Sequence, residues 1–190
     1  VKDVSSNNRD LLLTSGNEVS RVAGHTGNGL QQTTTGITYG PDPVPLMTPN
    51  LTVMMWLRIN ATGTFWVSEF YRSTLLPGPN DTGLFGILCA TAPRWRIKNP
   101  SNVATDIAFP DDIGNWHHIA VVWDGTSIFL YRDAVIVNAG GTVVPGGMWT
   151  GADVYRVFDG TGSNATIDDV QIFRSVKSAS EIATLMASPA

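Results

Sequence analysis

The chain has 190 residues, of which 43% are hydrophobic and 15% are charged, and this balance predicts one globular domain over residues 1–190. The net charge of −4 excludes a general affinity for polyanions, so nucleic acid is not an expected partner. The single Cys89 excludes an internal disulfide and is expected to be buried. No run approaches the roughly 18 apolar residues of a membrane span, so we expect no membrane insertion.

The first half of the chain predicts glycine-rich loops followed by strands. Within residues 1–36, glycine-rich loops are expected around Gly24, Gly27 and Gly29. Residues 51–59 (LTVMMWLRI) have the two-residue period of a β-strand. One face of that strand carries Leu51, Val53, Met55, Leu57 and Ile59. Trp56 lies on the opposite face. Further strands are expected at residues 64–71, 84–90 and 95–98.

Residues 115–137 (NWHHIAVVWDGTSIFLYRDAVIV) predict a β-hairpin with apolar residues on both faces, which is typical of a strand covered on both sides. The Asp124-Gly125 dipeptide accepts the positive φ angles of a tight turn between the two strands. Asp133-Ala134 begins a second turn. This hairpin is the strongest fold signal in the sequence.

The C-terminal part predicts two strands, at residues 154–158 and 165–173, and one short helix. Ser178 and Glu181 have the spacing of a capping box, in which each residue hydrogen-bonds the other's backbone N–H group. The helix is therefore expected from about Ala179 to Ala187.

The segment WHHIAVVWDGTSIFLYRDA resembles the signature of laminin G-like domains in the concanavalin A-like superfamily. LTVMMWLRI and ATIDDVQIF resemble two further family strands, so the likeness covers nearly the whole chain from Asp3 onward. The resemblance implies an all-β jelly-roll sandwich of two antiparallel sheets with one short C-terminal helix. Ala134 stands where the family usually has Gly. Related domains carry one more strand before Asp3, which is expected upstream of this sequence or from a partner chain.

The sequence does not predict catalysis. Polysaccharide hydrolases on this sandwich need two carboxylates flanking the sugar bond. The glutamates of this chain, Glu18, Glu69 and Glu181, lie in unrelated segments. His117 and His118 are adjacent on a predicted strand, so they point to opposite faces and cannot bind one metal ion together. We therefore expect a protein that is not an enzyme.

Calcium is the candidate cofactor. Asp3 and Asp168 stand at positions similar to those where some laminin G-like domains hold Ca²⁺, and Asn7 or Asn8 offers a further oxygen ligand. Alternatively, Asp3 forms an Asx turn and Asp168 accepts hydrogen bonds from neighbouring backbone N–H groups.

Sugar binding requires exposed aromatic rings, because their faces stack on pyranose C–H groups. The resemblance places Trp56, Trp116 and Trp123 in the core. Trp149 is flanked by glycines and is the best candidate for stacking, although it could instead close one end of the sandwich.

Strict alternation in RWRIK (residues 94–98) predicts a basic stripe on one strand face, formed by Arg94, Arg96 and Lys98. Trp95 and Ile97 are then buried on the other face. The stripe is either a site for the anionic groups of an acidic glycan or an ordinary solvated strand face.

The leading interpretation is a non-catalytic recognition or adhesion module whose partner is a glycan or a glycosylated surface. Such a module is expected to be extracellular or surface-exposed. The alternative belongs to another class: a structural or assembly module, such as a phage capsid decoration or fibre domain. Its partners would be capsid or fibre proteins or further copies of the same chain.

Overall fold

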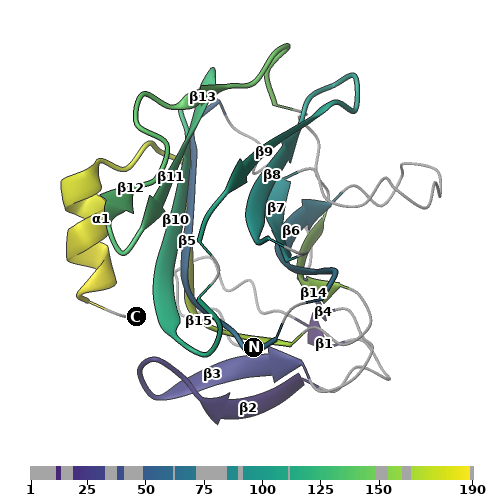
Figure 1. Cartoon of the computed structure of the whole chain (residues 1–190), viewed down its shortest axis with the longest axis vertical. Coiled ribbons are helices and arrows are strands. Elements are labelled where there is room, and N and C mark those ends of the chain that lie inside the picture. The colour runs from purple at the N-terminus through teal and green to yellow at the C-terminus, as the bar shows by residue number, and fades with distance from the viewer. Residues whose placement is uncertain are drawn as a thin grey trace.

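The computed structural model describes residues 12–13, 19–32, 38–40, 49–61, 63–71, 85–89, 92–110, 112–148, 154–159 and 164–188. Two antiparallel sheets pack face to face, with the main hydrophobic core between them (Figure 1). The predicted all-β sandwich is confirmed. The predicted binding residue Trp149 and the predicted calcium ligand Asp3 lie outside the described residues.

The larger sheet has eight strands. In spatial order they are β12 (Val135–Ile136), β11 (Ser127–Arg132), β10 (Trp116–Trp123), β5 (Leu51–Ile59), β15 (Ala165–Phe173), β3 (Asn28–Gln32) and β2 (Val19–Ala23), with β13 (Thr142–Val143) pairing with β11. The strands β2 and β3 form a hairpin: Gly24 and Gly27 lie in its turn, but the loop expected around Gly29 is wrong. Gly29 lies inside β3, where an added Cβ atom would come within 2.9 Å of the Ile167 carbonyl oxygen.

The smaller sheet has seven strands. In spatial order they are β1 (Leu12–Leu13), β4 (Thr38–Gly40), β14 (Val154–Asp159), β6 (Phe65–Tyr71), β7 (Phe85–Cys89), β8 (Arg94–Lys98) and β9 (Ala104–Ala108). The strands expected from the sequence within both sheets agree with these bounds to within one residue.

The core between the sheets follows the predicted alternation. Along β5 the five apolar residues expected on one face all belong to the main core cluster. Along β8, Trp95 and Ile97 are fully buried in the same cluster. Cys89 is buried as expected, at 2% exposure.

A second, smaller hydrophobic cluster lies on the outer face of the eight-stranded sheet. The helix α1 (Ala179–Met186) packs there, with Ile182 fully buried against Met54, Ala120 and Val122. The capping box of Ser178 and Glu181 is present, which confirms the predicted start of the helix. In Figure 1, α1 covers one part of this outer face, while the β2–β3 hairpin lies at the other end of the sheet. No helix of the described residues is long and apolar enough to cross a membrane.

The two turns of the central hairpin differ in how easily their residues adopt positive φ angles. Gly125 has φ of 98°, and the carboxylate of Asp124 accepts hydrogen bonds from the backbone N–H groups of the next turn residues. In the second turn, Asp133 and Ala134 have φ of 52° and 61°, in the left-handed region. Alanine there has no side-chain hydrogen bond to offset its steric cost.

We predict that Ala134→Gly stabilises the protein. The left-handed conformation costs a non-glycine residue roughly 1–2 kcal/mol. The extra freedom of glycine in the unfolded chain offsets part of this gain, by about 0.5–1 kcal/mol. The free energy of unfolding in urea should therefore rise by about 0.5–1 kcal/mol. The matched control Gly125→Ala should lower it. Equal or lower stability of Ala134→Gly would show that this turn carries no strain.

Candidate functional site

The basic stripe predicted on β8 is partly neutralised by a neighbouring strand. Arg96 donates two hydrogen bonds of 2.7 Å to the carboxylate of Asp106 on β9, and these bonds raise the pKa of Arg96. Arg94 Nε lies 3.7 Å from the same carboxylate. Lys98 is 5% exposed. The three cations therefore share one face, as predicted, but Asp106 offsets part of their charge.

The predicted calcium ligand Asp168 bonds to backbone N–H groups. Its Oδ2 accepts from Thr26 at 3.0 Å, and its Oδ1 accepts from Asp169 at 3.0 Å. These bonds are the ones expected for Asp168 under the alternative to calcium binding, in which its carboxylate accepts from backbone N–H groups. Among the residues with described positions, no cluster of three or more His, Cys, Asp or Glu could hold a metal ion. Since Asp3 lies outside that part of the chain, the calcium site stays a prediction.

The tryptophans expected in the core divide into two groups. Trp123 is buried at 3% exposure in the main cluster, as expected. The expectation for Trp56 and Trp116 is wrong, because both are half-buried and belong to neither hydrophobic cluster. They occupy positions of β5 and β10 that point away from the space between the sheets.

These two tryptophans form a surface patch with His25 and Arg58. The His25 ring stacks on the Trp56 ring, with a centroid distance of 3.4 Å and an interplanar angle of 9°. It meets the Trp116 ring edge-on at 6.2 Å. The guanidinium carbon of Arg58 lies 5.0 Å from the centroid of the Trp116 ring, in a cation–π contact. We call Trp56, Trp116, His25 and Arg58 the outer-face patch.

Asp168 fixes the hairpin that brings His25 to this patch. His25 lies in the turn between β2 and β3, and the next residue, Thr26, donates its backbone N–H to Asp168. The Thr26 hydroxyl also donates to Asp169 at 3.2 Å. A Cβ atom on Gly24 would lie 2.4 Å from Asp168 Oδ2, so this approach requires glycine. Asp168 thus positions the outer-face patch, because its carboxylate holds the β2–β3 turn that carries His25.

Arg58 differs from Arg96 in its partners. Its Nε donates to the side-chain oxygen of Asn60 at 3.0 Å, and its Nη2 lies 3.4 Å from the hydroxyl oxygen of Thr166. Both partners are neutral. Among the residues that the structure describes, no carboxylate pairs with Arg58. Within the described part of the chain, the outer-face patch therefore presents a guanidinium without a carboxylate partner beside an aromatic ring.

A buried histidine lies next to the patch. The ring of His118 meets the Trp56 ring edge-on at 5.4 Å, and the residue is 2% exposed. Burial lowers the pKa of His118 to about 4. The Nδ1 atom has no hydrogen-bond partner in the described part of the chain. At neutral pH this ring is therefore uncharged.

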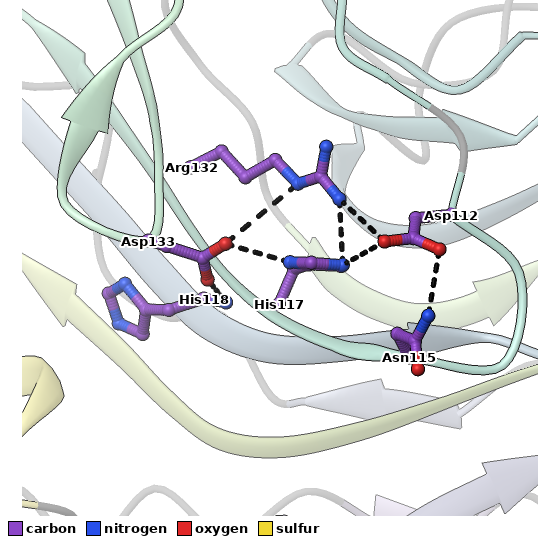
Figure 2. Close-up of polar contacts among 6 residues, drawn as sticks. All are labelled: Asp112, Asn115, His117, His118, Arg132 and Asp133. Atoms are coloured by element: carbon purple, nitrogen blue, oxygen red, sulfur yellow. Dashed lines mark hydrogen bonds and ion pairs between the residues drawn. The ribbon is translucent and has the colours of Figure 1, made fainter.

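His117 points to the opposite face from His118, as predicted, and belongs to a closed polar network (Figure 2). Its Nδ1 lies 2.7 Å from Asp133 Oδ2, and its Nε2 lies 3.1 Å from Asp112 Oδ2 and 2.7 Å from Arg132 Nη2. A hydrogen bond from Asn115, and then one from His117, lower the pKa of Asp112. The network joins the segment before β10 to the second hairpin turn, which suits a structural role.

The cleft beside this network is small. Its free volume is about 10 Å³, and its walls are mainly apolar residues of β5 and the segment before β10. Ligand pockets usually measure about 300–1,000 Å³. We therefore place the candidate binding site at the outer-face patch, on the opposite side of the eight-stranded sheet.

Acid should destabilise the protein through His118. The pKa of this residue is about 4 in the folded chain and 6.5 in the unfolded chain, so the unfolded chain binds the proton first as pH falls. Stability present above pH 6.5 is then lost progressively toward pH 4, by at most about 3 kcal/mol, at about 1.4 kcal/mol per pKa unit. His118→Phe keeps a ring beside Trp56 but cannot bind a proton.

The measurement is the melting temperature between pH 7 and pH 4. As the pH is lowered, the melting temperature of His118→Phe should fall less steeply than the melting temperature of the wild type. Ala134→Gly is the control, because it changes stability without a titratable group and should keep the wild-type slope. Identical slopes for His118→Phe and the wild type would contradict this role of His118.

Three solved structures show how widely this architecture is shared. The binding domain of Paraclostridial Mosquitocidal Protein 1 is 15% identical, with a TM-score of 0.73 over 98% of this chain and 49% of that chain. The botulinum neurotoxin serotype D ligand binding domain, in complex with N-acetylneuraminic acid, is 11% identical, with a TM-score of 0.77 over 98% and 47%. The receptor binding domain of the botulinum neurotoxin C/D mosaic serotype is 12% identical, with a TM-score of 0.77 over 98% and 48%.

Identities this low show the fold alone, and the chain spans about half the length of each of these proteins. No curated protein sequence matches it. A laminin G-like family model, described as the concanavalin A-like lectin/glucanases superfamily, matches residues 13–183, which is most of the sequence. The chain belongs to this laminin G-like family of the concanavalin A-like superfamily.

Proposed function

We propose that this chain is a non-catalytic recognition module that binds carbohydrate on a receptor or another glycosylated surface, outside the cell or on an exposed surface. The family is lectin-like, and three structural neighbours are binding domains, one of them in complex with N-acetylneuraminic acid. The observation that carries the proposal is the outer-face patch, in which Trp56 and Trp116 lie outside both hydrophobic clusters.

The chemistry of the patch suits a sugar. The apolar face of a pyranose ring packs against an indole, while guanidinium and amide groups bond its hydroxyls. Trp116 supplies the aromatic surface, and Arg58 and Asn60 supply polar groups next to it. Strands β5 and β10 hold these groups, so the site is built on rigid elements and loses little entropy on binding.

The predicted binding residues of β8 are an alternative place for the same sugar-binding function. Arg94, Arg96 and Lys98 lie on the outer face of the other sheet, so no single sugar spans them and the outer-face patch. Asp106 already accepts two hydrogen bonds from Arg96, and an acidic sugar would have to displace it. The outer-face patch requires no such displacement. The stacking role of Trp149 stays a prediction.

An assembly module is the second candidate function, favoured by an apolar sheet edge. Val135 of β12 is 69% exposed, and Val143 of β13 is 62% exposed, with Ile136 and Val137 also exposed. Exposed apolar residues on edge strands favour pairing with another chain. Capsid or fibre proteins, or copies of this chain, are the partners that such a function implies.

Light scattering separates these two functions. The recognition function predicts the mass of one chain in solution, 20.4 kDa. The assembly function predicts a defined oligomer that dissociates in the double variant Val135→Lys and Val143→Lys. A stable oligomer that this variant disrupts would contradict the assignment of the chain as a monomeric binding module.

A glycan array tests the proposed site. Trp116→Ala should reduce the signal of every bound glycan at least about tenfold, which corresponds to losing one stacking contact of about 1.4 kcal/mol. Arg96→Ala removes a cation of the alternative place on β8 and should bind like the wild type. Full binding by Trp116→Ala, together with loss in Arg96→Ala, would move the site to β8. Melting curves confirm that both variants are folded.

A further inference from the structure

Arg58 has no carboxylate partner among the residues with described positions, and this points to the class of sugar that the patch accepts. A guanidinium carries five N–H donors in one plane. Within the described part of the chain, the Asn60 side chain accepts from Nε and the Thr166 hydroxyl from Nη2, the latter at a weak 3.4 Å. The other three N–H donors of Arg58 have no partner among the described residues. By contrast, the guanidinium of Arg96 already donates two hydrogen bonds to the carboxylate of Asp106.

The position of Arg58 relative to Trp116 restricts the ligand further. The two residues are register partners on β5 and β10, and the guanidinium carbon lies 5.0 Å from the ring centroid. A ligand that carries an anionic group next to an apolar ring face can therefore contact both residues at once. Carboxylates form charge-assisted, two-pronged bonds with arginine, which are about twice as strong as neutral hydrogen bonds.

We propose that the outer-face patch selects acidic sugars, with the carboxylate of the sugar paired with Arg58 and its pyranose ring against Trp116. This inference rests on the proposed function, because it names the ligand class of the same site. Asn60 holds Nε of Arg58 and thereby orients the free edge of the guanidinium. It is a positioning residue for the anion.

The overall charge of the protein opposes an anionic ligand only weakly. The net charge of −4 is spread over the chain, and physiological salt screens exposed charges beyond about 8 Å. Asp168 is nearer, but both of its oxygens accept backbone hydrogen bonds and it is 8% exposed. A direct bond between a carboxylate and a guanidinium is charge-assisted and stronger than a neutral hydrogen bond, so the local pair decides the preference.

Matched sugar pairs test this inference. We would titrate the protein by calorimetry with 3′-sialyllactose against lactose, and with methyl glucuronide against methyl glucoside. Methyl glucuronide differs from methyl glucoside only in a carboxylate in place of a CH₂OH group, whereas 3′-sialyllactose adds a whole acidic sugar to lactose. In at least one pair the acidic member should bind about tenfold more tightly, and this preference should weaken as salt increases. Arg58→Gln should abolish the preference, so that the acidic member of a pair binds no more tightly than the neutral member.

Two further variants keep the test decisive. Arg96→Gln is the matched control on the other sheet and should retain the preference for the acidic sugar. Arg58→Lys keeps the charge but loses the planar fork, so it should retain only part of the preference, and it replaces Arg58→Gln if that variant does not fold.

The outcomes separate the two proposals. If the wild type binds both members of a pair equally, or if Arg58→Gln keeps the preference, the inference is wrong while the recognition function stands. Loss of the preference in Arg96→Gln would also overturn it, because the anion would then lie at β8. If no member of either pair binds and the glycan array is blank, the recognition function itself fails.

Discussion

The register of β5 between β10 and β15 is the constraint on which the rest of the structure depends. It aligns Arg58 with Trp116 and Trp56 with His118 on one side, and Trp56 with Asp168 on the other. Because side chains alternate along a strand, the same register fills the core with apolar residues and gathers these polar and aromatic residues on the outer face. A shift by one residue would exchange the two sets.

Much of the fold could be predicted from the sequence because its signals are local. The Asp124-Gly125 turn, the alternation along β5 and β8 and the capping box of α1 each depend on residues close together in the chain. The sequence does not predict the β2–β3 hairpin, because both strands are short and β3 is polar and contains Gly29, which weakens a strand pattern. There the hairpin depends on pairing with β15 and on Asp168.

The candidate site was less predictable, because its parts come from distant segments. His25 stacks on Trp56 from the turn between β2 and β3, and Asp168 holds this turn in place. No local sequence pattern predicts such a contact. The sequence did contain one usable signal, since alternation placed Trp56 opposite the apolar face of its strand. The family resemblance outweighed that signal and placed the residue in the core. Likewise, the neutralisation of Arg96 by Asp106 depends on pairing between β8 and β9.

The central claim is that sugar binds at the outer-face patch, and NMR of the tryptophan indole N–H groups tests it most directly. The chain has six tryptophans, which the indole resonances can distinguish. On titration with a glycan that the protein binds, we predict that the indole resonances of Trp56 and Trp116 shift. The resonances of Trp95 and Trp123, which are buried at 0% and 3% exposure, should not shift. Shifts confined to Trp149, or no shift at Trp56 and Trp116 at saturation, would contradict the account.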